Sequence, residues 1–90
     1  MLKSLLVEFL GTMFIVFVIF NTWNYLAIGA ATAIAIILGA KISGGAYNPA
    51  IATAFYVSGK LDKSKLLPYI IAETLGALAG FYLFKHVVEK

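Results

Sequence analysis

Apolar residues fall into four runs along the chain, separated by short polar stretches. The runs cover about residues 5–22, 24–41, 49–58 and 66–88. The first, second and fourth come close to the roughly 20 residues that a helix needs to cross a bilayer. The pattern therefore predicts an all-α integral membrane protein, with one domain over residues 1–90 and three transmembrane helices.

The third run is too short to cross. A helix of ten residues rises about 15 Å, roughly half of the ~30 Å hydrocarbon core. Pro49 suits the first helical position, Asn48 before it is a preferred N-cap, and Gly59 can end the helix. A half-length helix with a polar cap predicts a re-entrant element that places its polar tip at mid-membrane.

The loop before this half-helix must then descend into the membrane. Irregular backbone at that depth is tolerated only where it is buried in protein or lines a water-filled cavity. We therefore expect the chain to line an aqueous path, with a pore loop formed by Ser43, Gly44, Gly45, Ala46 and Tyr47.

Composition agrees with a membrane environment. The chain is 62% hydrophobic with a mean hydropathy of +0.97. Its lysines lie near the ends of the runs, which indicates anchoring at the membrane surface rather than nucleic-acid binding. With no cysteine, no metal-ligand cluster, no nucleophile–base pair and no phosphate loop, the sequence predicts neither an enzyme nor a cofactor.

Two carboxyl groups, Glu8 and Glu73, fall inside apolar runs. Intramembrane carboxyls usually face the protein interior and mark function. Proton-coupled transport is one interpretation of this pair.

Small residues recur at four-residue spacing in the second run (Ala27, Ala31, Ala35, Gly39) and in the last (Ala72, Gly76, Gly80). Such stripes let helix backbones approach closely in a membrane. They fit either general helix packing or a specific dimer face.

Three motifs resemble one family. The segment Gly44-Gly45-Ala46-Tyr47-Asn48-Pro49-Ala50 resembles the signature of the aquaporin and glycerol-facilitator (major intrinsic protein) family. Glu8 to Thr12 resembles that family's Glu-x-x-x-Thr, and Ile71 to Ala77 resembles its Ala-Gln/Glu-x-x-Gly-Ala. The likeness covers nearly the whole chain but only the first half of a family member.

The resemblance implies an hourglass channel of two inverted repeats, whose half-helices meet tip to tip at the midplane. Asn48 would donate hydrogen bonds to solutes, and Pro49 and Ala50 would form the tip contact. The positive ends of the half-helices would disfavour cations and protons. Glu8, Thr12 and Glu73 would support the loop.

The resemblance also places Ile28, Ile36 and Ile51 at the constriction. Ile51 follows the motif, Ile28 stands where the family often has an aromatic residue, and Ile36 would face the filter of an inverted partner. An apolar filter predicts passage of small neutral solutes such as glycerol or dissolved gases without sharp water selectivity. An apolar neck can also dewet and conduct nothing.

One copy supplies half a pore, so we expect two inverted copies to pair. Five lysines (Lys3, Lys41, Lys60, Lys63, Lys65) fall on the N-terminal side and two (Lys85, Lys90) on the other. This bias favours one orientation, which leaves open a partner chain of opposite topology. The sequence thus predicts a passive channel for water and small uncharged solutes, or alternatively a non-conducting membrane scaffold derived from a half-channel.

Overall fold

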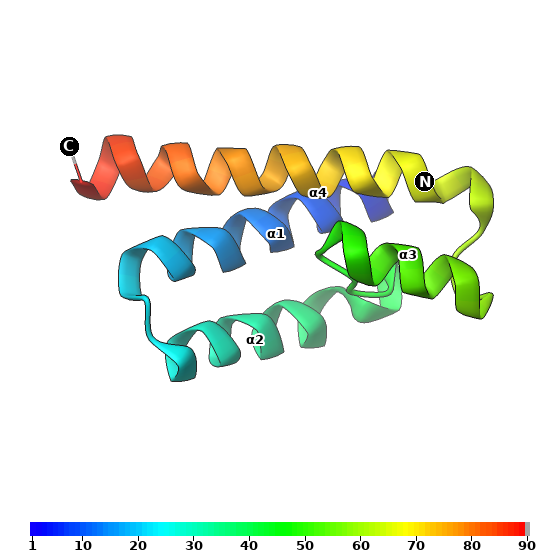
Figure 1. Cartoon of the computed structure of the whole chain (residues 1–90), viewed down its shortest axis with the longest axis horizontal. Helices are drawn as coiled ribbons and strands as arrows, with labels where there is room; N and C mark the ends of the chain where they lie inside the picture. Colours follow the sequence, from blue (N-terminus) through cyan, green and yellow to red (C-terminus); the bar gives the residue numbers. More distant parts are fainter. Residues whose placement is uncertain (90) are drawn as a thin grey trace.

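The computed structural model describes residues 1–89; Lys90 lies outside the described residues. Its helices are α1 (Leu2–Thr22), α2 (Tyr25–Ser43), α3 (Pro49–Ser58) and α4 (Lys63–Leu83), and α4 continues into a π-helical segment, η1 (Phe84–Glu89) (Figure 1). Three of these units are long and apolar enough to cross a membrane: α1, α2, and α4 together with η1. The expected all-α fold of three long helices and one short helix is confirmed.

The long helices lie roughly parallel to the longest axis, and α3 occupies only one half of it (Figure 1). Helix α3 begins near the middle of the molecule and runs back toward the end where α2 finishes (Figure 1). The chain extends 41 Å along this axis, close to the ~40–45 Å of a bilayer with its headgroups. The polar start of α3 therefore lies at about half the depth of the fold.

Helix contacts within residues 1–89 are unequal. Helix α1 packs on both α2 and α4, and α3 packs on α4. The backbone of α2 packs only on that of α1, and α2 reaches α4 through the hydrogen bond from the Tyr69 hydroxyl to the carbonyl of its last residue, Ser43. Within the described residues, one long side of α2 and the exposed side of α3 are consequently left without a neighbouring helix.

Local sequence explains the helix ends. Trp23 ends α1 in a left-handed conformation, and the side chain of Asn24 caps α2 by accepting a hydrogen bond from Ala27 N at 3.0 Å. Asn48 caps α3 with Pro49 in its first turn, and Gly59 ends it at φ 88°. Asn48 and Pro49 thus occupy the helix start, and Gly59 the left-handed helix end, where these residue types are preferred.

The long helices extend beyond the apolar runs. Helix α1 starts at Leu2 rather than residue 5, α2 continues to Ser43, and α4 starts at Lys63 rather than residue 66. Polar residues such as Lys63 can form a first helical turn at the membrane surface, where water satisfies their unpaired backbone groups. The change to π-helix at Phe84 had no counterpart in the apolar pattern.

The small-residue stripes serve contacts inside the chain. A Cβ atom on Gly76 would collide with the backbone oxygen of Phe9, and one on Gly80 would lie 2.5 Å from Met13 O. The backbones of α1 and α4 therefore touch at these glycines. Ala31, Ala35 and Gly39 are buried on α2, whose helix neighbour is α1.

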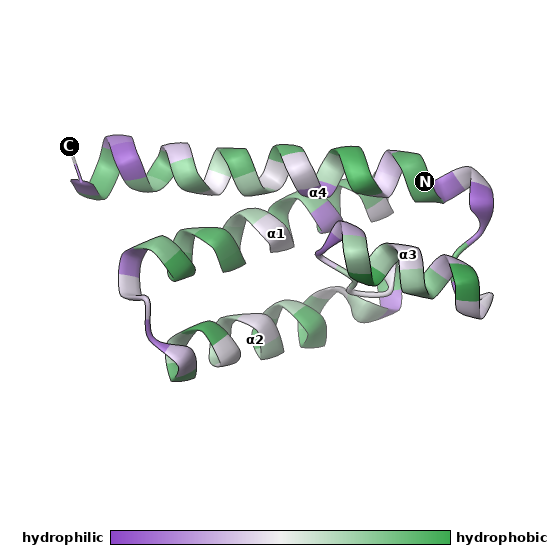
Figure 2. Ribbon diagram, viewed as in Figure 1, coloured by the Kyte–Doolittle hydropathy of each residue, from purple (hydrophilic) through white to green (hydrophobic). Residues whose placement is uncertain are grey.

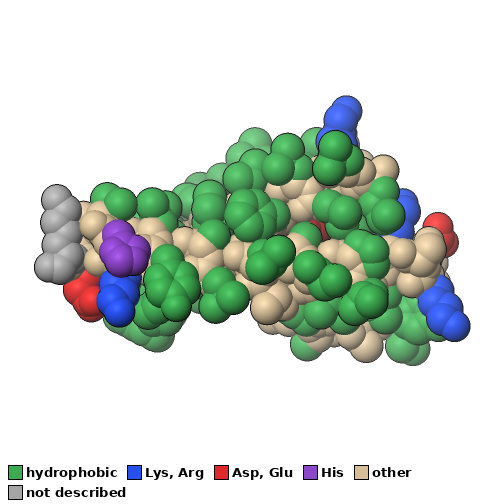
Figure 3. Space-filling view, turned by 90° about the horizontal axis from the view of Figure 1, so that it is seen from above, with side chains coloured by type: hydrophobic (Ala, Val, Ile, Leu, Met, Phe, Trp, Pro, Cys, Tyr) green, Lys and Arg blue, Asp and Glu red, His purple; other side chains and the backbone are tan. Residues whose placement is uncertain are grey.

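Polarity follows the long axis. Hydrophilic residues gather at the ends of the long helices and at the start of α3, and the remaining ribbon is mainly hydrophobic (Figure 2). In the space-filling view, most charged side chains lie near the two ends, a lysine side chain also projects from the upper edge, and apolar side chains cover much of the surface between the ends (Figure 3). This distribution matches a multi-pass integral membrane protein.

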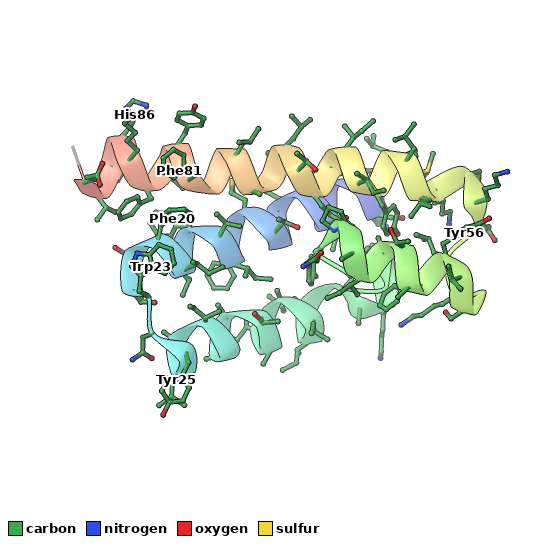
Figure 4. All side chains as sticks on the ribbon, viewed as in Figure 1. Phe20, Trp23, Tyr25, Tyr56, Phe81 and His86 are labelled. Atoms are coloured by element: carbon green, nitrogen blue, oxygen red, sulfur yellow. The ribbon has the colours of Figure 1, made fainter. Side chains whose placement is uncertain are left out.

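Aromatic side chains gather at the end formed by the α1–α2 turn and the C-terminal part of α4 (Figure 4). The ring of Phe20 lies 5.1 Å from that of Trp23 and 5.0 Å from that of Phe81. Tyr82 stacks on His86 at 6.2 Å. Such clusters are typical of residues at a membrane–water interface.

Candidate pore loop and half-helix

The loop between α2 and α3 has an unusual backbone. Gly44 and Gly45 adopt left-handed conformations, with φ of 91° and 69°. Tyr47 also has a positive φ of 53°. Because a side chain makes this conformation unfavourable by about 1–2 kcal/mol, other contacts must hold Tyr47 in place.

Tyr47 is fixed through its backbone and through its ring. Its N–H donates to Glu8 Oε1 at 2.8 Å, and its carbonyl accepts from Thr12 Oγ1 at 3.1 Å. The ring reaches α2, where the hydroxyl donates to Ala35 O at 2.5 Å. Tyr47 therefore joins the loop to both α1 and α2.

Two glycines make room for the ring. A Cβ atom on Gly11 would lie 2.6 Å from Tyr47 Cδ1, and a Cβ atom on Gly39 would collide with the Tyr47 hydroxyl. Tyr47 thus occupies a slot between α1 and α2 that only glycine permits. The sequence predicted that Tyr47 lies in the loop but did not predict this slot. Gly11 and Gly39, inside two apolar runs, were the residues that could have indicated it.

Glu8 holds the start and the end of the loop together. It is fully buried, and its Oε2 accepts from the Ser43 hydroxyl at 2.5 Å while Oε1 accepts from Tyr47 N. Ser43 is also held from α4, because the Tyr69 hydroxyl donates to Ser43 O at 2.8 Å. Tyr69 was not among the expected site residues.

Glu73 reaches the same region from α4. It is fully buried and lies against the side chain of Glu8 and the backbone of Asn48. Neither of its carboxyl oxygens has a hydrogen-bond partner within residues 1–89. The structure thus brings Glu8, Thr12 and Glu73 together around the loop. Glu8 and Thr12 form hydrogen bonds with loop residues, whereas Glu73 forms none within the described residues.

Asn48 is exposed at the tip of α3. Its Oδ1 accepts from Ala50 N at 2.8 Å, which completes the helix cap. The amide nitrogen takes no part in this cap, so its two hydrogens remain as donors. Ala50 is exposed beside it and Pro49 is half-buried.

The three isoleucines are not brought together. Ile51 is 44% exposed in the first turn of α3, and Ile36 is 43% exposed on α2. Ile28 is half-buried near the start of α2, eight residues from Ile36, which is about 12 Å along a helix. A constriction built from these residues needs atoms from another repeat.

Metal binding finds no support in this region. Among residues 1–89, no group of three or more His, Cys, Asp or Glu side chains could hold a metal ion.

Comparison with known proteins identifies the family. The model of the major intrinsic protein family matches residues 21–90. The chain belongs to the major intrinsic protein family. Members of this family are membrane channels and not enzymes, so the expected membrane location and non-enzymatic class are confirmed.

Similarity to individual members of the major intrinsic protein family supports this assignment. The chain is 36% identical to glycerol uptake facilitator protein-like 6 of Lactiplantibacillus plantarum, over 98% of this chain and 45% of that protein. It is 41% identical to the glycerol uptake facilitator protein of Buchnera aphidicola (67% and 24%) and 34% identical to aquaporin Z of Brucella melitensis (89% and 42%). The chain spans less than half the length of these relatives. No solved structure gives a significant match.

Proposed function

We propose that this chain forms half of a passive channel for water and small uncharged solutes such as glycerol. The observation that carries the proposal is the position of Asn48. Asn48 is exposed at the start of a half-length helix, at about half the depth of the fold, and its amide hydrogens are not used by the helix cap. A solute with a free lone pair can accept a hydrogen bond there. The names of the relatives, glycerol facilitator and aquaporin, support the same class of solute.

The opposite half of the channel is a second inverted repeat, supplied by another copy of this chain or by a partner of opposite topology. The support comes from unpartnered surfaces. Within residues 1–89, the backbone of α2 packs only on that of α1, and α3 exposes Ala50, Ile51 and Val57. Pairing around a two-fold axis in the membrane plane brings the two α3 tips together, with Pro49 and Ala50 in contact and Ile28, Ile36 and Ile51 around the neck.

An osmotic assay tests conduction. The full chain is reconstituted into liposomes, and the rate of shrinkage is followed after a step of impermeant osmolyte and after a step of glycerol. We expect rates above those of protein-free liposomes for both. Water permeability that is high while glycerol is excluded contradicts the apolar neck.

Two substitutions separate the pore donor from the helix cap. Asn48→Asp keeps an oxygen for Ala50 N but removes both amide hydrogens, so permeation should fall to the liposome background. Asn24→Asp is the matched control, because Asn24 caps α2 in the same way at the end of the molecule. Lipid-like permeability in folded, assembled wild-type protein favours the non-conducting scaffold instead.

Single cysteines test the pairing, because the chain has none of its own. Ala50→Cys should cross-link two copies through a short reagent, since the two tips meet. Val57 is also exposed, at 77%, but it lies at the other end of α3, so Val57→Cys should not cross-link. Cross-linking at Val57 alone refutes the tip-to-tip arrangement.

A further inference from the structure

We propose that Glu8 and Glu73 form a proton-binding site that holds one proton, on Glu73, and that this proton keeps the pore loop seated. The proposal concerns the folded chain itself and does not depend on conduction.

The two carboxyls have different partners. Glu8 receives two hydrogen bonds, from the Ser43 hydroxyl and from Tyr47 N, which are the contacts of an ionised carboxylate. Glu73 lies against Glu8 and receives no hydrogen bond within the described residues. A carboxyl group beside a carboxylate acquires a partner if it is protonated, since it then donates to its neighbour.

Among residues 1–89, no positively charged group faces the pair. The titratable groups that face it are Tyr47 from the loop and Tyr69 from α4, together with the two carboxyls themselves. Helix α3, which packs on α4, carries no charged residue. Two adjacent, fully buried negative charges without a cation are strongly unfavourable in a low-dielectric interior.

Loss of the proton would act on the loop directly. An ionised Glu73 would repel Glu8, which holds Ser43 and Tyr47, and it would lie against the backbone of Asn48. Protonation of Glu73 on α4 is therefore coupled to the position of the tip of α3.

Infrared spectroscopy tests the protonation state. The chain has four acidic side chains, and two of them, Asp62 and Glu89, are exposed. The double variant Asp62→Asn/Glu89→Gln leaves Glu8 and Glu73 as the only side-chain carboxyls. At neutral pH, the folded double variant should show the carbonyl band of a protonated carboxylic acid, shifted in D2O. Absence of that band overturns the proposal.

Adding Glu73→Gln to this background should abolish the band, because glutamine has the shape of the neutral acid but no carboxyl. A band that persists in the folded triple variant places the proton on Glu8 and refutes the assignment. If the triple variant does not fold, the band of the double variant still decides whether the pair holds a proton.

The pH dependence of folding provides a second readout. Unfolded glutamates are ionised above about pH 5, so the folded chain binds one more proton than the unfolded chain. Stability then falls as pH rises, and the folding equilibrium constant drops about tenfold per pH unit until the proton leaves.

Reversible unfolding in dodecyl sulfate, measured at successive pH values, should show this slope in wild type and in Glu89→Gln and lose it in Glu73→Gln. Equal slopes in all three proteins overturn the proposal. Stabilisation by added sodium at constant ionic strength, without the infrared band, would identify a bound cation in place of the proton and would also overturn it.

Discussion

A methyl group on Gly11 should destabilise the protein, whereas the same change at Gly29 should stabilise it. Both glycines lie inside long helices. A Cβ atom on Gly11 would lie 2.6 Å from Cδ1 and 2.7 Å from Cζ of Tyr47, while one on Gly29 meets nothing within 4 Å. Gly11→Ala and Gly29→Ala therefore differ in steric contact and share the change in helix propensity.

The size of the effect follows from two terms. Replacing an interior helical glycine by alanine favours the helix by about 1 kcal/mol. Overpacking costs typically about 1–3 kcal/mol, and Tyr47 cannot move aside easily because its N–H, carbonyl and hydroxyl are all bonded. We expect Gly29→Ala to raise the free energy of unfolding by up to about 1 kcal/mol. The free energy of unfolding of Gly11→Ala should be about 1–3 kcal/mol lower than that of Gly29→Ala, because the gain in helix propensity is the same in both variants and only overpacking differs.

Reversible unfolding in dodecyl sulfate, followed by circular dichroism, measures both variants under one condition. A double-mutant cycle with Tyr47→Ala identifies the cause, because removal of the ring should make Gly11→Ala harmless or favourable. Equal shifts for the two alanine variants, or a Gly11 effect that persists without the ring, would show that the slot between α1 and α2 does not fix the loop.

Three further predictions concern the contacts around the loop and the α1–α4 interface. Ser43→Ala removes the 2.5 Å hydrogen bond to buried Glu8, so the free energy of unfolding should drop by about 1–3 kcal/mol; no measurable drop would contradict a bracing role. Tyr69→Phe deletes the hydroxyl that donates to Ser43 O at 2.8 Å and should lower the free energy of unfolding by about 1 kcal/mol. Tyr82→Phe, on an exposed ring, is the control and should have no effect in the same unfolding assay. Gly80→Ala would bring a methyl 2.5 Å from Met13 O; forcing two backbones apart should cost about 1–3 kcal/mol, and unchanged stability would mean that α1 and α4 do not touch there.

Much of the fold could be predicted because membrane helices leave a strong sequence signal. Apolar run length identified three spanning helices, and the Asn–Pro and Gly59 signals located both ends of α3. The helix ends at the surface were less predictable, since polar residues such as Lys63 can extend a helix into the interface without any change in apolar pattern. The π-helical turn at Phe84 has no such signal.

The candidate site was predictable in its residues but only partly in its contacts. The motif located the loop, and the intramembrane position of Glu8 and Glu73 indicated that both face inward, which their burial matches. Sequence could not distinguish their hydrogen bonding, because both are glutamates in apolar helices. The slot for Tyr47 and the hydroxyl of Tyr69 escaped prediction because they depend on how three helices meet, which no local pattern encodes.

The anchoring of Tyr47 also has a consequence for the order of assembly. Its bonding partners, Glu8, Thr12 and Ala35, and the glycines that admit its ring all precede it in the chain. Synthesis proceeds from the N-terminus, so the residues of α1 and α2 that bind Tyr47 are synthesised before the loop leaves the ribosome. Helix α4 is synthesised after the loop and packs against a loop whose binding partners on α1 and α2 are already present.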